Sequence, residues 1–403
     1  MTTPTDLPAT LPSLPDDPFD AGVLTDPYPF HRRLRDAGPL ALLPRHNLHA
    51  MGRFDEVKAA LGDWATFVSG RGAGLADFAR DKPWRPPSLL LEADPPAHTA
   101  VRSAMNGVLA PREIRALRAG FTQVAEEIAQ HLVERGAFDA VRDLAEVYPL
   151  RVFPDAVGLP ATGRENLLPY GSLAFNAFGP DNELRRAALA SAAPVQDWIL
   201  ASCQRDALAP GGFGARIWAA ADRGDITHEQ APMLVRSLLS AGVDTTVHGL
   251  ANTMYALASH PGQWELLHEQ PRLAAFAFDE ALRWESPVQT FFRTTARDAP
   301  VAGAVIPAGS KVLLFLGSAN RDPRRWGADA DQFDVRRRAA GHVAFGMGIH
   351  QCVGQPLARL EAELVLAALA RRVRRVELAG TPVPRLNNTL KGWASVPVRV
   401  EPA

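Results

Sequence analysis

The chain has 403 residues, of which 47% are hydrophobic and 22% are charged, and its formal net charge is −1 at pH 7. This composition excludes a disordered, collagen-like or fibrous chain and predicts a soluble protein with a large core. The near-neutral charge disfavours nucleic acid as a partner, and two cysteines are too few for the disulfide framework of a small secreted protein. We therefore expect a cytoplasmic protein.

The first 18 residues are rich in proline and lack the basic start and apolar segment of a signal peptide. We expect residues 1–18 to form a mobile arm and residues 19–403 to form a single domain, because no linker or repeat divides the rest of the chain. The sequence contains no run of about 18 apolar residues, the length that crosses a bilayer, so we expect no membrane association.

Helical periodicity dominates the sequence and predicts a mainly α fold with small β-sheets. In chain order we expect a strand at 49–51, helices at 111–135, 229–259 and 263–284, strands at 290–295 and 311–316, a helix at 354–375 and a strand at 396–400. The polar segment 317–341 has no clear period, and unstructured stretches of that length are usually functional.

The residues before the last predicted helix carry the strongest functional pattern. They read Phe-Gly-Met-Gly-Ile-His-Gln-Cys-Val-Gly over residues 345–354 and place Cys352 at a helix entrance. Backbone N–H groups and the helix dipole there favour an anionic sulfur, so we expect a low pKa and a role as metal ligand or nucleophile. Gly348 and Gly354 allow a flat ligand to approach the backbone, and Phe345 can shield the sulfur from water.

This spacing resembles the haem-ligand loop of the cytochromes P450, and the resemblance extends along nearly the whole chain. It implies the cytochrome P450 fold, with haem b held between a long central helix and this loop and with Cys352 as axial ligand of the iron. An inert buried cysteine and a zinc site are the alternatives, although His350 and Cys352 supply only two zinc ligands. Cys203 fits no motif and is expected to be a structural thiol.

A pair of charged residues upstream matches the family's E-x-x-R motif. Glu280 and Arg283 fall on one helix face, where the family's pair clamps an irregular segment, and the resemblance makes Arg337 the third member. An ordinary surface ion pair is the alternative.

The central helix contains an acid and two hydroxyls in an otherwise apolar pattern. The resemblance makes Asp244 and Thr245 the family's acid–alcohol pair, with Asp244 relaying protons from solvent, and places Ala241 and Gly242 in the groove where dioxygen binds. A threonine that only bends its own helix is the alternative. Haem also carries two propionates, and four residues match the family's partners for them: His98, Arg102, Arg293 and His350.

Substrate recognition depends on segments that vary within the family. Prolines in residues 84–92 could hold Arg85 and Ser88 toward an anion, and phenylalanines could form a flat aromatic slot. The expected substrate contacts are Arg85, Ser88, Leu91, Phe175, Phe178, Arg236, Ser237, Ser240, Val288 and Phe291. These segments resemble the bacterial cytochromes P450 that O-demethylate 4-methoxybenzoate and related para-substituted benzoates.

The resemblance implies a monomeric monooxygenase that uses O2. Because the sequence has no flavin or dinucleotide fingerprint and no cysteine quartet, electrons from NAD(P)H are expected to arrive through an external reductase and a 2Fe–2S ferredoxin. An acidic ferredoxin would dock on arginines near the cysteine loop, with Arg321, Arg324, Arg325 and Arg371 as candidates.

Other functions remain open from the sequence. A cytochrome P450 could hydroxylate another small hydrophobic substrate such as a terpenoid, or the protein could bind haem as a sensor or electron carrier. A haem-free cysteine hydrolase would use Cys352 with His350, but no third orienting group is evident.

Overall fold

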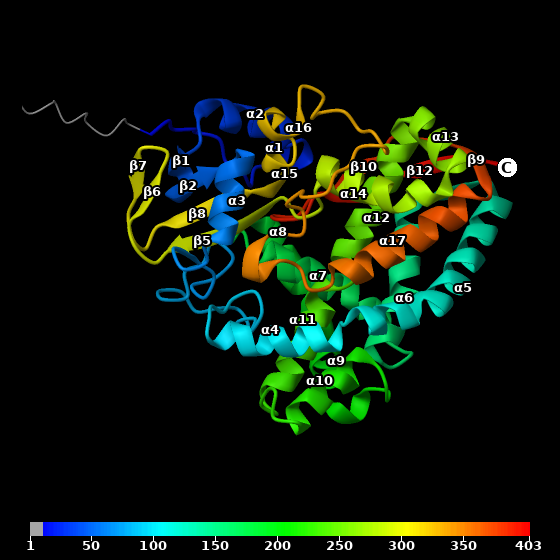
Figure 1. Cartoon of the computed structure of the whole chain (residues 1–403), viewed down its shortest axis with the longest axis horizontal. Helices are drawn as coiled ribbons and strands as arrows, with labels where there is room; N and C mark the ends of the chain where they lie inside the picture. Colours follow the sequence, from blue (N-terminus) through cyan, green and yellow to red (C-terminus); the bar gives the residue numbers. More distant parts are fainter. Residues whose placement is uncertain (1–10) are drawn as a thin grey trace, which may run out of the picture.

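Helices form most of the computed structural model, which describes residues 11–403. Figure 1 shows a five-stranded sheet on one side of the molecule and a larger body of helices on the other. The helices are α1 (Ala21–Thr25), α2 (Tyr28–Ala37), α3 (Phe54–Gly62), α4 (Ala97–Val108), α5 (Pro111–Arg135), α6 (Val147–Val157), α7 (Leu167–Asn176), α8 (Glu183–Ala192), α9 (Gln196–Ser202), α10 (Phe213–Asp222), α11 (Gln230–Ala241), α12 (Asp244–Ser259), α13 (Pro261–Glu269), α14 (Ala274–Glu285), α15 (Leu316–Ala319), α16 (Pro323–Trp326) and α17 (Gln355–Ala370).

The strands are short and belong to four small sheets. They are β1 (Ala41–Leu43), β2 (Leu48–Met51), β3 (Phe67–Val68), β4 (Ala137–Asp139), β5 (Thr290–Thr295), β6 (Ala299–Val301), β7 (Ala304–Ile306), β8 (Lys311–Phe315), β9 (Val373–Leu378), β10 (Val383–Arg385), β11 (Gly392–Ser395) and β12 (Pro397–Pro402). The prediction of a mainly α fold with small sheets is confirmed.

Two predicted helices are each broken into two. The segment 229–259 forms α11 and α12, and the segment 263–284 forms α13 and α14, with Pro271 in a short 3-10 turn between them. Proline lacks the N–H that a continuous helix needs, which explains the second break. The helix predicted at 354–375 ends early, at Ala370, because residues from Val373 onward enter β9.

The second half of the predicted mobile arm, residues 11–18, is held against the sheet. Residues 1–10 lie outside the described residues, but residues 11–18, which belong to that arm in the sequence prediction, pair with the sheet. The N–H of Leu14 donates to Leu42 at 2.9 Å, and the N–H of Leu42 donates to Pro12 at 2.8 Å. Leu11 and Leu14 also pack against the core, and this burial of leucine between the prolines explains the difference.

The five-stranded sheet has the order β1-β2-β8-β5-β3, in which β5 runs antiparallel to β8. Alternate residues of a strand point to opposite faces. Phe292 therefore packs into the core with Phe30 and Phe315, whereas Phe291 and Arg293 point to the other face, where a cavity lies. Strand β5 thus positions one aromatic and one cationic side chain together.

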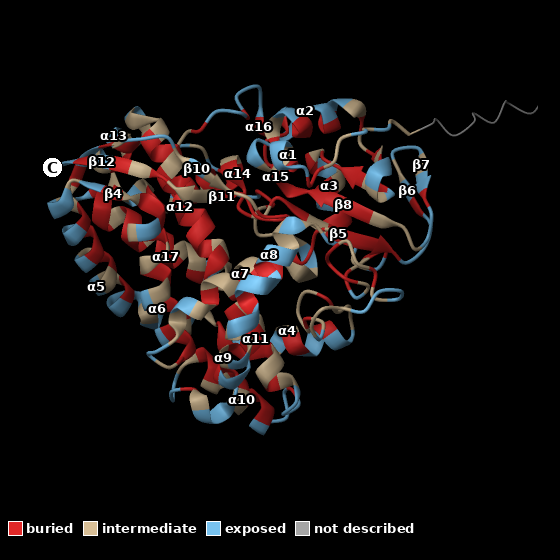
Figure 2. Ribbon diagram, turned by 180° about the vertical axis from the view of Figure 1, so that it is seen from behind, coloured by how far each residue is buried: buried red, intermediate tan, exposed pale blue. Residues whose placement is uncertain are grey.

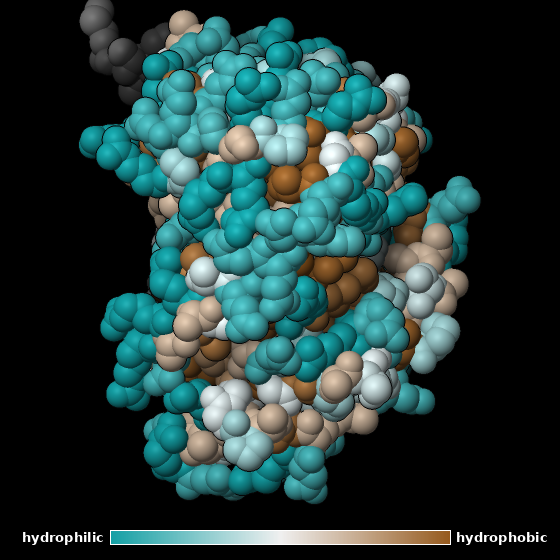
Figure 3. Space-filling view, turned by 90° about the vertical axis from the view of Figure 1, so that its right-hand side faces the viewer, coloured by the Kyte–Doolittle hydropathy of each residue, from teal (hydrophilic) through white to brown (hydrophobic). Residues whose placement is uncertain are grey.

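The helical core surrounds α12, whose residues are buried on nearly all sides (Figure 2). Hydrophilic residues cover most of the face in Figure 3, and apolar residues show between them in small patches. Within residues 11–403, no helix combines the length and the apolar character that a membrane span requires.

Candidate active site

A cavity with about 1690 Å³ of empty space, including its mouth, lies between the cysteine loop and helices α11 and α12. The cavity brings together most of the predicted site residues, namely Arg85, Ser88, Leu91, Arg102, Phe175, Phe178, Ser237, Ser240, Ala241, Gly242, Thr245, Val288, Phe291, Arg293, Phe345, His350, Cys352 and Gly354. Four of the predicted residues do not line the cavity in the described part of the chain, and these are His98, Arg236, Asp244 and Gly348.

The loop before α17 holds Cys352 with its sulfur open to the cavity. The N–H of Cys352 donates to the carbonyl of Phe345 at 2.9 Å, which closes the loop. Gly348 has a left-handed φ of 70°, and a Cβ there would lie 2.7 Å from the carbonyl oxygen of Leu61 on α3. Gly348 therefore serves the turn and its packing against α3.

The surroundings of Cys352 do not make its sulfur anionic by themselves. Burial raises the pKa of the Cys352 thiol, and the N–H of Gly354, the Arg102 guanidinium and the N–H of Gln355 oppose the rise without cancelling it. The N–H groups at the helix entrance lower this pKa as expected, but burial outweighs them, so the expected net low pKa is wrong for the thiol alone. A bound metal cation deprotonates a thiol ligand, so the site suits a thiolate that forms together with its metal.

One edge of the cavity carries cationic and imidazole groups that fit haem propionates. The rings of His98 and His350 lie 4.6 Å apart, and the Nε2 atom of each has no hydrogen-bond partner within residues 11–403. Arg293 is 2% exposed, and its Nη1 donates to the carbonyl of Phe292 at 2.8 Å. Burial lowers the pKa of Arg293 to about 10, so the side chain remains charged at pH 7. A buried cation is costly without an anion, and a propionate would supply one.

Arg102 and His350 tie the cysteine loop to neighbouring segments. Arg102 on α4 donates to the carbonyl oxygens of Ile349 and Gln351, at 3.1 and 2.6 Å. Nδ1 of His350 lies 3.0 Å from the carbonyl oxygen of Leu90, in the loop before α4. These contacts fix both side chains at the edge where the predicted haem would place its carboxylates.

The central helix breaks beside the cavity, between Ala241 and Asp244. At Gly242 a Cβ would lie 2.1 Å from the ring of Phe153, so the packing of α6 requires glycine at this position. The hydroxyl of Thr245 donates to the carbonyl of Ala241 at 2.7 Å, across the break. Thr245 therefore bonds back to its own helix, as the alternative interpretation expected. Its side chain also lines the cavity.

Asp244 lies behind the cavity wall rather than on it. Successive helical residues point about 100° apart, so Thr245 can face the cavity while Asp244 faces α7. The Asp244 side chain is buried, and within the described residues neither of its carboxylate oxygens has a hydrogen-bond partner. Burial raises the pKa of Asp244 to about 7, the positive charge of Arg385 opposes the rise, and Glu146 adds to it. The carboxyl can therefore hold or release a proton near neutral pH.

The loop before α4 covers one end of the cavity with two arginines and one acid. Nη1 of Arg85 lies 3.1 Å from Oε2 of Glu92, which also accepts from the N–H of Ser88 at 2.7 Å. Nη2 of Arg236 on α11 donates to the carbonyl of Pro86 at 2.8 Å and braces this loop from behind. The three side chains are largely buried and leave one excess positive charge at this end.

Aromatic rings form another part of the wall. Phe178 lies edge-to-face with both Phe175 and Phe291, with centroid distances of 5.9 and 5.7 Å. Leu91 and Val288 pack against these rings. The two predicted serines, Ser237 and Ser240, line the cavity while their hydroxyls donate to carbonyls of their own helix.

The three predicted structural residues meet in a buried cluster. Arg283 binds both carboxylate oxygens of Glu280, at 2.7 and 2.8 Å, and Nε of Arg337 donates to the same carboxylate at 3.1 Å. Arg283 also donates to the carbonyl oxygens of Asn320, Ala330 and Gln332. The cluster therefore fastens the irregular segment 317–341 to α14.

Several residues of the cavity wall were missed from the sequence, among them Glu361, and Leu390 behind the wall was missed as well. Glu361 on α17 is 1% exposed, and burial raises its pKa; an acid in an otherwise apolar helical pattern was the available signal. Leu390 packs with Phe175 and Phe178 from a loop that has no periodic pattern, so nothing in the sequence indicated it.

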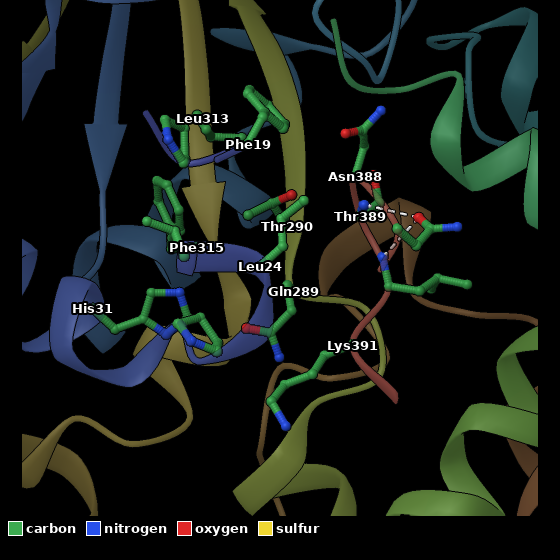
Figure 4. A pocket seen from close by; sticks show the side chains of 15 residues that line it. Phe19, Leu24, His31, Gln289, Thr290, Leu313, Phe315, Asn388, Thr389 and Lys391 are labelled. Atoms are coloured by element: carbon green, nitrogen blue, oxygen red, sulfur yellow. Dashed lines mark hydrogen bonds between the residues drawn. The ribbon is translucent and has the colours of Figure 1, made fainter. Parts of the chain in front are cut away.

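A smaller cavity lies on the far side of β5, between the N-terminal helices and the segment 387–391. Figure 4 shows His31, Thr290, Phe315 and Lys391 around it. Thr290 faces this cavity and Phe291 faces the larger one, so β5 separates the two.

One of the arginines predicted to receive ferredoxin is buried. Arg321 is 6% exposed, lies 3.4 Å from Glu285 and stacks over the ring of Tyr28 at 3.5 Å. It therefore holds the core together and is unavailable for docking, because its neighbours already satisfy its charge. Arg324, Arg325 and Arg371 are on the surface, although Arg371 is paired with Glu126.

Known proteins are similar to this sequence along all or nearly all of its length. Residues 215–399 match the family model Cytochrome P450. The Rhodopseudomonas palustris protein Cytochrome p450 CYP199A2 is 56% identical, over 100% of this chain and 98% of that protein. The beta-dihydromenaquinone-9 omega-hydroxylase of Mycobacterium tuberculosis is 31% identical, over 96% of this chain and 78% of that enzyme.

Solved structures share the fold. Cytochrome P450 CREJ in complex with (4-ethylphenyl) dihydrogen phosphate has a TM-score of 0.86 at 26% identity, over 96% of this chain and 99% of that chain. Cytochrome P450 CYP109Q5 from Chondromyces apiculatus has a TM-score of 0.81 at 28% identity, over 98% of this chain and 100% of that chain. With a relative more than half identical along its entire length, a matching fold and a cysteine open to the central cavity, the chain belongs to the cytochrome P450 family.

Proposed function

We propose that this cytochrome P450 monooxygenase oxidises a small aromatic carboxylic acid, by oxidative O-demethylation of 4-methoxybenzoate or a related para-substituted benzoate. The observation that carries the proposal is the excess positive charge of Arg85, with Arg236 behind it, over Glu92 at one end of a cavity whose wall also carries Phe175, Phe178 and Phe291. A structural neighbour supports it, since CREJ is described with (4-ethylphenyl) dihydrogen phosphate, an aromatic ring with an anionic group and a para substituent.

The proposed binding mode follows from the shape of the cavity. The carboxylate pairs with Arg85 near Ser88, and the ring enters the slot formed by Phe175, Phe178 and Phe291. The para substituent then points toward the cysteine loop. Because the ring is held at both ends, the methoxy carbon is presented in one orientation, which is how positioning lowers a barrier.

Haem bound through Cys352 supplies the activation of dioxygen, and the chain's own residues supply orientation and protons. His98, Arg102, Arg293 and His350 would hold its propionates. Thr245 holds a hydroxyl at the cavity wall, and Asp244 supplies protons from behind it. In the overall reaction, one oxygen atom of O2 enters the methyl group and the other leaves as water, with two electrons and two protons consumed. The resulting hemiacetal releases formaldehyde and 4-hydroxybenzoate.

Electrons are proposed to come from NAD(P)H through a reductase and a 2Fe–2S ferredoxin in the cytoplasm. Arg324 and Arg325 are exposed near the cysteine loop, since Arg325 lies beside Gly341. An acidic partner docking there would be attracted at low ionic strength and released at high salt.

Optical titration tests the substrate. Addition of 4-methoxybenzoate to the ferric protein is expected to shift the haem from low to high spin, and turnover with a ferredoxin system is expected to release formaldehyde. The absence of both would reject benzoate as the substrate.

The carboxylate anchor is tested separately with Arg85→Ala. Hydrogen bonds to charged groups contribute about 1.5–3 kcal/mol, so binding of 4-methoxybenzoate is expected to weaken by about 10- to 100-fold. The neutral analogue 4-methoxybenzamide is the matched control and is expected to bind the variant almost unchanged. An equal loss for both ligands would exclude a role for Arg85 in binding the carboxylate.

A further inference from the structure

A buried histidine lies one turn after Asp244 on the central helix. Asp244 and His248 are each 2% exposed, and Nε2 of His248 lies 3.7 Å from Oδ1 of Asp244. This distance is longer than a hydrogen bond, but a small rotation or one water molecule would close it. Buried polar atoms are nearly always paired, and Asp244 Oδ1, Asp244 Oδ2 and His248 Nδ1 have no partner in the described part of the chain.

Two glycines on neighbouring elements make room for this pair. A Cβ at position 171 on α7 would lie 2.7 Å from Cβ of Asp244, and one at position 392 on β11 would lie 1.9 Å from Nδ1 of His248. The imidazole therefore occupies the space that a side chain on β11 would fill. Glycine at these two positions allows both side chains to enter the core.

The Nδ1 side of the His248 imidazole faces the hairpin of β10 and β11. Gly392 pairs with Arg385 in the hairpin of β10 and β11, so Arg385 lies next to the strand position that His248 contacts. Nη2 of Arg385 lies 2.9 Å from Oε1 of Glu146, and these two side chains are 32% and 20% exposed. A partly solvated ion pair thus lies on the hairpin that packs against His248, and the charge of Arg385 acts on the ring.

From this arrangement we infer that His248 passes protons from the solvated Glu146–Arg385 pair to Asp244. The proton is accepted at Nδ1 from a water beside the ion pair, and the proton on Nε2 goes to Oδ1 of Asp244, so the ring ends neutral. The starting tautomer is restored when Nδ1 returns its proton to water and Nε2 takes one from water, so the net transfer is one proton from solvent to Asp244. Neutral imidazole can do this because it carries a donor and an acceptor on opposite sides.

The charges around the pair suit a relay. Burial lowers the pKa of His248 to about 3, with a further contribution from Arg385, so the ring does not trap a proton at neutral pH. Asp244 stores the proton instead, because its pKa of about 7 lies near the working pH. Arg385 and Glu146 are the charged groups that act on the pair from the elements packed against α12. The inference concerns proton supply in a P450 monooxygenase and is independent of the identity of the substrate.

Two variants separate a relay from a structural role. His248→Phe fills the space without titrating, and His248→Gln keeps a donor and an acceptor but cannot exchange them as imidazole does. If His248 is a relay, both variants lower kcat by about 100-fold or more, the contribution of a positioned proton-transfer group, with KM unchanged and a larger solvent isotope effect. Thr253→Val on the same helix, whose hydroxyl donates to its own backbone at Gly249, is the control and should behave as the wild type.

A readout without turnover accompanies the kinetics. In the ferric haem protein, the infrared band of the protonated Asp244 carboxyl, assigned by its loss in Asp244→Asn, should titrate near pH 7. In His248→Phe the midpoint should rise, because an apolar neighbour stabilises the carboxylate less. The proposed relay is wrong if His248→Gln has the kcat and the isotope effect of the wild type. It is also wrong if His248→Phe changes neither the kinetics nor the infrared midpoint. The infrared arm needs no substrate, so a wrong benzoate assignment would leave it intact.

Discussion

Two buried charged clusters in this molecule differ in one respect, the completeness of their hydrogen bonding. In the cluster of Glu280, Arg283 and Arg337, the carboxylate accepts from both arginines, and Arg283 also binds three backbone carbonyls. At Asp244 and His248, three polar atoms have no partner within residues 11–403. Glu280, Arg283, Asp244 and His248 are almost fully buried, and Arg337 is partly buried.

The difference indicates what each cluster does. A satisfied network fixes one conformation, and here it fastens the segment 317–341 that leads to Cys352. An unsatisfied pair costs stability, but its protons remain free to move. The first cluster therefore holds the haem loop in place, and the second is suited to supplying protons.

Removal of Arg283 is expected to have the largest effect on stability. Arg283→Ala leaves the Glu280 carboxylate buried with only Arg337 beside it, and breaking a buried pair in this way costs about 3–5 kcal/mol. Chemical denaturation of the purified protein should show the loss, together with weaker haem retention. Arg336→Ala is the control, because Arg336 is exposed and pairs only with its neighbour Asp334 on the described surface. Equal stability of the two variants would contradict the structural role of the cluster.

Substitution in the cluster of Asp244 and His248 should raise the stability of the protein at high pH, whereas Arg283→Ala lowers it. The pKa of Asp244 is raised to about 7 in the folded protein and is about 3.9 when unfolded, so the native state binds the extra proton between these values. Stability therefore falls as pH rises from about 4 to 7, by roughly 4 kcal/mol at most. Asp244→Asn removes this loss and should be more stable than the wild type at pH 8, but not at pH 4, while turnover slows.

Denaturation at the two pH values measures this effect. Thr253→Val, a change of similar size on the same helix, should show no such dependence on pH. A stability difference between Asp244→Asn and the wild type that is the same at pH 4 and pH 8 would mean that Asp244 is not protonated in the native protein.

The comparison also shows how far the sequence could predict the site. Motif spacing located Cys352, Glu280 and Arg283 because each depends on a local pattern, a loop or one helix face. The same spacing placed Asp244 beside Thr245 but could not show that the break at Gly242 turns the acid toward α7. Gly242, at that break, packs against Phe153, which is distant in sequence.

Long-range contacts explain the other differences. Nothing local indicated that Gly392 would lie against His248, or that Arg321 would be stacked between aromatic rings and lost as a docking residue. The helix break at Pro271 was predictable because proline marks it. The break at Gly242, where Phe153 packs, has no such mark and was missed. The arm predicted through Pro18 failed for the same reason, because leucines between its prolines pack on the core.

The pair of Arg85 and Glu92 is hydrogen-bonded less completely than the Glu280 cluster and more completely than Asp244 and His248. Glu92 partly neutralises Arg85 at the substrate end of the cavity. Glu92→Gln should free the guanidinium and tighten binding of 4-methoxybenzoate by several-fold, about 1 kcal/mol, since a charged competitor is removed. Optical titration with 4-methoxybenzoate and with 4-methoxybenzamide measures the effect. If the amide gains as much as the acid, the change arises from the loop and not from charge.

The smallest effect is expected at Arg324, because water reaches its own charge and the N–H groups of Phe54 and Arg324 still bind Asp322 when the guanidinium is removed. Arg324 is exposed and pairs with Asp322 at 3.2 Å, so Arg324→Ala should change the free energy of unfolding by less than about 0.5 kcal/mol. If a ferredoxin docks beside it, reduction by that partner should slow by a few-fold at low ionic strength, and the difference should vanish at high salt because the attraction is screened. Stopped-flow reduction at two salt concentrations measures this. Reduction rates that match the wild type at both concentrations would exclude Arg324 from the docking surface, whereas a loss that persists at high salt would indicate a structural change instead.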